Sequence, residues 1–154
     1  MITTWGGSGL SPKAPGTAGS LAALPFAWAI AWAFGPLGLA VAALAAFLIG
    51  WWASYRHVTV SGEKDPGKIV IDEVAGQWMT LIPLAPDLLG YALGFIAFRA
   101  ADILKPWPAS WADRSIGGGL GIMVDDIFAA IWSLAAMIVL CQIGVIPAAP
   151  LLAF

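Results

Sequence analysis

Charged residues are scarce in this sequence. Only 10% of its 154 residues are Asp, Glu, Lys or Arg, whereas 60% are hydrophobic and the mean hydropathy is +0.88. Soluble domains carry about 25% charged residues, so this composition excludes an ordinary soluble domain. The sequence therefore predicts a protein that lies in a membrane.

Other common features are missing too. No linker rich in Ser or charge and no internal repeat interrupts the chain, which predicts a single domain over residues 1–154. The N-terminus lacks the basic start and following apolar core of a cleaved signal, so we expect it to be retained. Cys141 is the only cysteine, which excludes a disulfide framework and a thiolate metal site. Nothing in the charge pattern indicates nucleic-acid binding.

Long apolar segments are what the sequence has instead. The first, from Leu21 to Ala53, contains no charged residue and is too long for one crossing of a hydrocarbon core roughly 30 Å thick. Gly35-Pro36 is the natural break, which predicts two helices, 20–34 and 37–53, that cross twice or form a re-entrant hairpin. Further helices are expected over 69–84, 88–104 and 120–143. The prediction is an all-α integral membrane bundle of about five apolar helices.

Lysine and arginine residues are confined to one side of the predicted helices. They precede the first helix, follow the second and surround the loop before the last. They are Lys13, Arg56, Lys64, Lys68, Arg99, Lys105 and Arg114. Of the acids, only Asp87 is expected on the opposite side. The positive-inside rule makes the basic side cytoplasmic, with the N-terminus inside and the C-terminus outside.

A glycine-rich stretch, "GSGLSPKAPGTAGS", leads from Gly7 to Ser20 into the first helix. Its glycines and hydroxyls allow backbone N–H groups to approach an anion, and Thr17 or Ser20 could cap the helix, whose N-terminus attracts phosphate. Lys13 adds a positive charge. The alternative interpretation is a flexible cap made of turn residues.

Carboxylates gather at the cytoplasmic ends of three predicted helices. Asp72 and Glu73 open the third helix, Asp102 lies near the end of the fourth, and Asp125 and Asp126 open the last. They could simply lie at the headgroup level, where acids favour helix N-termini. Without partners, however, acids brought to one place would repel one another, and a hard divalent cation resolves that. Oxygen ligands without cysteine or a histidine cluster favour magnesium over zinc.

Basic residues accompany the acids. Arg99, Asp102 and Lys105 follow one another at intervals of three, which places them on neighbouring parts of one helical face. Such a line suits a phosphate beside a bound cation. The competing interpretation is a snorkelling anchor whose interface is marked by Trp107 and Trp111. Together with the carboxylates, the pattern favours a phosphorylated substrate that enters from the membrane surface.

Several routes to phosphate chemistry are excluded by residue type. Cys141 has no arginine a few residues later, as a cysteine phosphatase needs, and His57 alone cannot serve a lipid phosphatase that needs more than one histidine. His57 is interpreted as a solvated interface residue. No Asp-x-Asp follows a buried strand. Carboxylate-plus-metal chemistry remains, in which the cation polarises a phosphoryl oxygen.

The polar motifs together resemble the phosphatidylglycerophosphatase A family. They are "GSGLSPKAPGTAGS", "IVIDEVAGQW", "FRAADILKPWP" and "GGGLGIMVDDIFAAI", in this order and with similar spacing from Gly7 to Ile131. Four motifs that agree with a family in order and spacing are far more specific for that family than any one motif alone. The resemblance implies an integral protein of the bacterial inner membrane whose site faces the cytoplasm. It also implies a magnesium-dependent enzyme that removes the terminal phosphate from phosphatidylglycerophosphate, giving phosphatidylglycerol in phospholipid biosynthesis.

The resemblance also implies roles for residues of this sequence. Metal ligands would be Asp72, Glu73, Asp125 and Asp126, and Asp102 would be a further ligand or the base that orients water. Catalytic candidates are thus Asp72, Asp102 and Asp125. Phosphate would be bound by Lys13, Gly16, Thr17, Arg99 and Lys105. Direct attack by water and an aspartyl-phosphate intermediate on Asp72 or Asp125 both stay open.

Other functions fit part of the pattern. A cation transporter also places acids in a helical bundle, but it predicts them at mid-depth on several spans rather than at one face. Another membrane lipid phosphotransfer enzyme, such as an alcohol phosphatidyltransferase, would carry an Asp-Gly-x-x-Ala-Arg signature that this sequence lacks. A small scaffold subunit would leave the basic and glycine-rich elements without a task.

Overall fold

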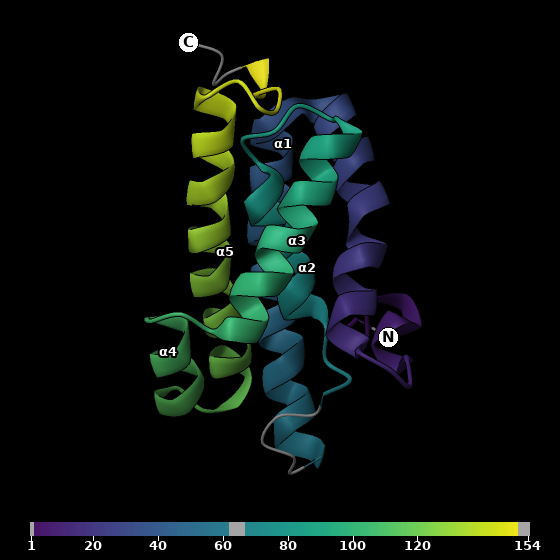
Figure 1. Cartoon of the computed structure of the whole chain (residues 1–154). Helices are drawn as coiled ribbons and strands as arrows, with labels where there is room; N and C mark the ends of the chain where they lie inside the picture. The colour runs from purple at the N-terminus through teal and green to yellow at the C-terminus, as the bar shows by residue number, and fades with distance from the viewer. Residues whose placement is uncertain (1, 62–66, 151–154) are drawn as a thin grey trace.

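The computed structural model describes residues 2–61 and 67–150 of the chain (Figure 1). Its elements are η1 (Trp5–Leu10), α1 (Pro15–Ser61), α2 (Ile71–Leu81), α3 (Leu88–Leu104), α4 (Ala109–Ser115) and α5 (Gly118–Gln142). Within those ranges the fold is all-helical, apart from one isolated β-bridge between Leu84 and Ala148. Lys64, one of the basic residues predicted to be cytoplasmic, lies outside the described residues.

Helix α1 folds back on itself at Gly35. Gly35 has φ 67° and ψ −169°, a backbone conformation that is essentially restricted to glycine, and Pro36 follows it. Figure 1 shows residues 15–34 running to one end of the molecule and residues 36–61 returning behind them. Ile30 and Ile49 accordingly line one apolar groove, although a straight helix would separate them by about 28 Å. The predicted break at Gly35-Pro36 is confirmed.

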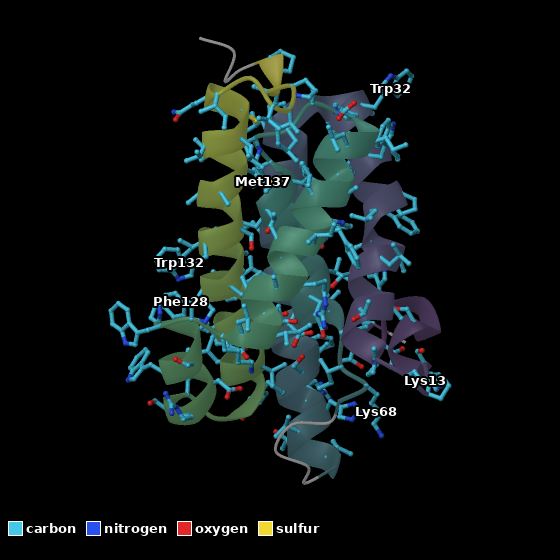
Figure 2. The ribbon with its side chains drawn as sticks, in the orientation of Figure 1. Lys13, Trp32, Lys68, Phe128, Trp132 and Met137 are labelled. Atoms are coloured by element: carbon cyan, nitrogen blue, oxygen red, sulfur yellow. The ribbon has the colours of Figure 1, made fainter. Side chains whose placement is uncertain are left out.

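By length and composition, two helices of the described residues are candidates to cross a membrane. Residues 15–60 and Gly118–Gln142 are long and apolar enough to span one, and large apolar side chains such as Trp32 point outward from this part of the fold (Figure 2). By contrast α2 has 11 residues and is about 16 Å long. A bundle of about five membrane helices is therefore supported only in part. The described chain is all-helical, and two of its helices suggest membrane association.

Helix α2 lies at the centre of the helical packing, where nine of its eleven residues are buried. Gly76 explains how closely its neighbours approach. A Cβ atom at Gly76 would lie 2.5 Å from the ring of Phe98 on α3 and 3.2 Å from the backbone oxygen of Asp126 on α5. Small residues permit such close helix contact. This packing brings the acidic ends of α2 and α5 together.

The N-terminal residues support the start of α2. The N–H of Val70 donates to the backbone oxygen of Thr3 (2.8 Å), and the ring of Trp5 meets the ring of Trp78 edge-on at 5.5 Å. The indole N–H of Trp78 donates to the backbone oxygen of Ala23 on α1 (3.0 Å). These contacts hold the first turn of α2, with its two acids, against α1.

The opposite end of the bundle is joined by main-chain hydrogen bonds. The N–H of Ala85 donates to the oxygen of Pro147 (3.1 Å), and the N–H of Ala149 donates to the oxygen of Pro83 (2.8 Å). These bonds connect the segment after α5 to the loop between α2 and α3, and we call them the main-chain clasp. Asp87 then caps α3 by accepting a hydrogen bond from the N–H of Gly90 (2.8 Å).

Candidate active site

The beginnings of α1, α2 and α5, the end of α3 and the short helix α4 meet at one end of the molecule (Figure 1). A cavity of about 540 Å³ lies between them. The predicted site residues that line it are Gly16, Asp72, Glu73, Arg99, Asp102, Lys105, Asp125 and Asp126. Residues that are distant in sequence therefore converge on one polar cavity.

Three carboxylates of this cavity lie close together. Oxygen atoms of Asp72, Glu73 and Asp126 all lie within 4.8 Å of one another, and we call this group the carboxylate triad. Asp72 and Asp126 are 9% and 4% exposed. One oxygen of each triad residue, Asp72 Oδ1, Glu73 Oε2 and Asp126 Oδ2, is buried with no hydrogen-bond partner in the protein. Buried, unpartnered carboxylate oxygens at this spacing fit a hard cation such as magnesium, which takes only oxygen ligands.

Asp125 points to a different partner. Its carboxylate accepts a hydrogen bond from the Lys105 ammonium (2.7 Å), and it is not a member of the carboxylate triad. Neighbouring residues on a helix diverge by about 100°, so Asp125 and Asp126 face different sides of α5. The predicted ligand set is thus divided into three carboxylates that meet and one that binds a lysine.

Arg99 and Asp102 connect the triad to the basic side of the cavity. The Arg99 guanidinium hydrogen-bonds the Asp102 carboxylate and lies 3.9 Å from Glu73 Oε1. Their side chains are 14% and 13% exposed, so this pair is largely shielded from solvent. Arg99 therefore places a positive charge beside the triad, as the spacing of three residues along α3 predicted.

Only one of the predicted N-terminal phosphate ligands reaches the cavity. Gly16 lines it, and a Cβ atom at this position would lie 2.1 Å from Glu73 Oε1. Lys13 is exposed and extends from the edge of the molecule (Figure 2), and Thr17 is half-buried on α1 but does not line the cavity. The expectation that Thr17 or Ser20 caps the helix is wrong. Since α1 begins at Pro15, both lie inside its first turns, and the Ser20 hydroxyl donates to the oxygen of Gly16 (3.0 Å).

The cavity also contains two residues that sequence reasoning did not assign to it. Asp113 and Arg114 of α4 both line its wall, and Asp113 accepts a hydrogen bond from Lys105. The available signal was an adjacent acid and base in a loop containing Trp107 and Trp111. That loop has too few residues for a periodic pattern to show which side chains turn inward.

Lys105 ends α3 with a left-handed backbone conformation, φ 44° and ψ 58°. Burial alone would lower its pKa, but hydrogen bonds to the Asp113 and Asp125 carboxylates outweigh burial and raise the pKa of Lys105 above its ordinary value of 10.5. A raised pKa means that the stabilisation from these pairs is complete below pH 10.5 and is lost as the pH rises through the higher value of the folded state.

We therefore expect Lys105 to resist amine-reactive reagents that label exposed lysines. At pH 8.5, labelling of Lys105 should be at least about tenfold slower than that of Lys13 or Lys68, because the reagent needs a neutral amine. Mass spectrometry of the labelled peptides measures the rates. Asp113→Asn should accelerate labelling of Lys105 and leave Lys13 unchanged. Equal rates at all three lysines in the unmodified chain would contradict the paired geometry.

Comparison with known proteins identifies the family. A model described as phosphatidylglycerophosphatase A matches residues 1–141. The phosphatidylglycerophosphatase A of Escherichia coli is 44% identical over 129 residues, covering 82% of this chain and 74% of that protein. The enzyme of the same name from Haemophilus influenzae is 35% identical, covering 82% of this chain and 78% of that protein.

A relative with a different name is also similar. A putative phosphatidylinositol-3-phosphatase of Bacteroides thetaiotaomicron is 34% identical over 141 residues, covering 86% of this chain and 87% of that protein. No solved structure matches the chain. The family match over residues 1–141 and the identity to two named members agree, and the chain belongs to the phosphatidylglycerophosphatase A family.

Proposed function

We propose that this protein is a magnesium-dependent phosphatase that hydrolyses phosphatidylglycerophosphate to phosphatidylglycerol and phosphate in phospholipid biosynthesis. Its family membership makes it a phosphatase, and its named relatives support this lipid as the substrate. The observation that carries the proposal is the carboxylate triad, whose unpartnered oxygens lie in the same cavity as Arg99 and Lys105. Cation, phosphate and water can meet there.

We further propose that the protein is integral to the bacterial inner membrane and that the cavity faces the cytoplasm. Two apolar helices support membrane insertion. Lys13 and Lys68 lie at the same end of the molecule as the cavity (Figure 2), and the positive-inside rule favours a cytoplasmic position for that end. A lipid substrate would then present its phosphate to the cavity from the inner leaflet.

The proposed mechanism assigns each group of residues one task. Asp72, Glu73 and Asp126 would hold magnesium, which when bound polarises the phosphoryl oxygens and makes a nucleophilic water available near neutral pH. Asp102 would accept a proton from the attacking water. Arg99 and Lys105 would neutralise the charge that develops on the phosphoryl oxygens as the bond between phosphorus and the glycerol oxygen breaks. Gly16 leaves space for Glu73 to reach the metal.

A covalent route remains the alternative, with the nucleophile on Asp72 or Asp125. In that route a carboxylate oxygen attacks phosphorus as the bond to the glycerol oxygen breaks, and that oxygen takes a proton from water. A second water later cleaves the aspartyl-phosphate, releases phosphate and gives its proton to solvent. Acid quenching during turnover of a substrate labelled in its terminal phosphate distinguishes the routes. Label retained on the protein supports the covalent route, and its absence under rapid turnover supports direct attack by water.

Phosphatidylinositol 3-phosphate is a second candidate substrate, since a relative at 34% identity is named for it. Both lipids carry a phosphate monoester on a polar alcohol that a phosphodiester joins to the diacylglycerol. The test of the proposed function is release of inorganic phosphate by purified protein in detergent, with the two lipids and phosphatidic acid compared at equal mole fraction. Release from phosphatidylglycerophosphate at less than a tenth of the rate seen with either other lipid would overturn the proposal.

Asp125→Asn should lower the rate of phosphate release by about 10- to 100-fold, because the substitution removes the negative charge that orients Lys105. The fold should remain intact, since the Asn amide oxygen can still accept the hydrogen bond from Lys105. The rate is measured in the same assay, and the melting temperature serves as the control. Unchanged activity would exclude Asp125 as the nucleophile and would show that its negative charge is not needed to orient Lys105.

A further inference from the structure

The three basic side chains that line the cavity differ in their pairing. Arg99 and Lys105 each contact two carboxylates, whereas Arg114 has no carboxylate partner among the described residues. Arg114 instead donates from Nε to the backbone oxygen of Ser110 (2.8 Å), one turn earlier on α4. That bond fixes the base of the guanidinium and leaves its two terminal nitrogens available. Arg114 is therefore the basic group of the cavity that is ready for an external anion.

Exposure increases from the carboxylate triad towards α4. The side chains of Glu73 and Arg99 are each 14% exposed, Lys105 is 31% exposed and Asp113 is 40% exposed. Arg114 follows Asp113 and is itself exposed. A ligand whose reacting phosphate lies at the triad would thus pass Lys105 and leave the cavity beside Arg114.

Aromatic residues indicate where α4 lies relative to a membrane. Trp107, Trp111 and Trp132 are 74%, 49% and 51% exposed, and the Trp132 indole donates to the backbone oxygen of Trp107 (3.1 Å). Exposed tryptophans gather at the level of the lipid headgroups. The phosphodiester groups of lipids lie at this level. Arg114 lies on the cavity side of the same segment.

We propose that Arg114 binds the phosphodiester of the lipid substrate while the terminal phosphate monoester lies at the carboxylate triad. The proposal rests on the proposed function and adds the feature that the site recognises, namely two phosphates joined by a short polar alcohol. A planar guanidinium with two free nitrogens matches the two non-bridging oxygens of a phosphodiester. Phosphatidic acid carries a monoester alone and has nothing for Arg114 to bind. Arg114 is thus a specificity-determining residue.

The experiment compares three compounds and three variants. The compounds are phosphatidylglycerophosphate in detergent micelles, its water-soluble deacylated headgroup, which keeps both phosphates, and phosphatidic acid in the same micelles. The variants are Arg114→Gln, Arg114→Lys and Arg56→Gln. Arg56 is a matched control, since it stacks over Trp52 at 5.6 Å on α1 and does not line the cavity. Where a compound is not hydrolysed, its inhibition constant against phosphatidylglycerophosphate replaces KM.

Arg114→Gln should raise KM about tenfold for the lipid and for its deacylated headgroup, with kcat within about twofold, because the charged contact with a non-reacting phosphodiester is lost. The KM or inhibition constant for phosphatidic acid should not change. Arg114→Lys should recover part of the loss, and Arg56→Gln should behave as the unmodified protein.

Three results would overturn this inference. An equal loss of affinity for all three compounds would mean that Arg114 acts on the monoester or on the fold. A loss on both lipids but not on the soluble headgroup would make Arg114 a membrane anchor, and no loss on any compound would leave it without a role. A different result, failure of the unmodified protein to hydrolyse phosphatidylglycerophosphate at all, would overturn the proposed function and this inference with it.

Discussion

Asp126→Asn is expected to abolish magnesium-dependent phosphate release, with a fall of about 10³-fold or more in kcat. Asp126 is 4% exposed and supplies one of the three carboxylates of the triad, and an amide oxygen binds a hard cation much more weakly than a carboxylate does. Excess chelator should remove the activity of the unmodified protein to the same extent. Phosphate release is measured across a magnesium titration, which separates a lower affinity for the metal from a lower maximal rate.

The same substitution is expected to stabilise the metal-free protein. The three triad carboxylates, of which Asp72 and Asp126 are buried, repel one another when no cation neutralises them. Asn keeps the size of the side chain while it removes one charge. In chelator, the melting temperature of Asp126→Asn should exceed that of the unmodified protein by about 2–4 °C. Magnesium should raise the melting temperature of the unmodified protein but not that of the variant. A magnesium-induced rise of equal size in both proteins would show that the cation binds elsewhere.

Gly16→Ala should have the second-largest effect, a loss of about 10²- to 10³-fold in kcat/KM. The new methyl group would lie 2.1 Å from Glu73 Oε1 and 3.1 Å from Arg99 Nη1, so we expect the Glu73 carboxylate to shift from its position in the triad. Because helix α1 is otherwise compatible with alanine, the fold should persist. The apparent affinity for magnesium should fall together with the rate, and both are measured in the phosphate-release assay.

Gly117→Ala is the matched control for this prediction. Gly117 lines the same cavity and has φ −94° and ψ 169°, which alanine adopts readily, and a Cβ atom there would have no other atom within 4 Å. Its activity should remain within about twofold of the unmodified protein. Equal losses in the two variants would show that the cavity tolerates no added methyl group anywhere, and the specific clash between Gly16 and Glu73 would not be the cause.

Sequence reasoning predicted the helical fold because its strongest signals are local. A run of 33 apolar residues interrupted by Gly35-Pro36 has few structural solutions, and the structure folds back at that dipeptide. The sequence predicted a helix over 69–84, whereas α2 is shorter and spans Ile71–Leu81. Its apolar sequence continues to Leu84, but Leu84 pairs with Ala148 instead of extending the helix. Such a pairing depends on a segment more than sixty residues away, and Pro83 is the local sign that the helix cannot continue.

In the site, too, the features set by local sequence could be predicted, whereas those set by distant contacts could not. Acids within apolar segments require partners, which predicted that acids of three helices would gather at one end, and Asp72, Glu73 and Asp126 do meet there. The lysine partner of Asp125 could not be predicted in this way, because it depends on how α5 is rotated and on where α3 ends with Lys105. The inward position of Arg114 also escaped sequence reasoning, because a short helix carries no periodicity from which to read its faces.

The main-chain clasp has a consequence for how this chain tolerates substitutions. Its hydrogen bonds are made by peptide groups of Pro83, Ala85, Pro147 and Ala149, so they do not depend on the identity of most side chains around them. At the other end, a single methyl group at Gly16 meets a carboxylate of the triad. We therefore expect substitutions of the side chains around the clasp to disturb the protein less than a substitution at Gly16 does.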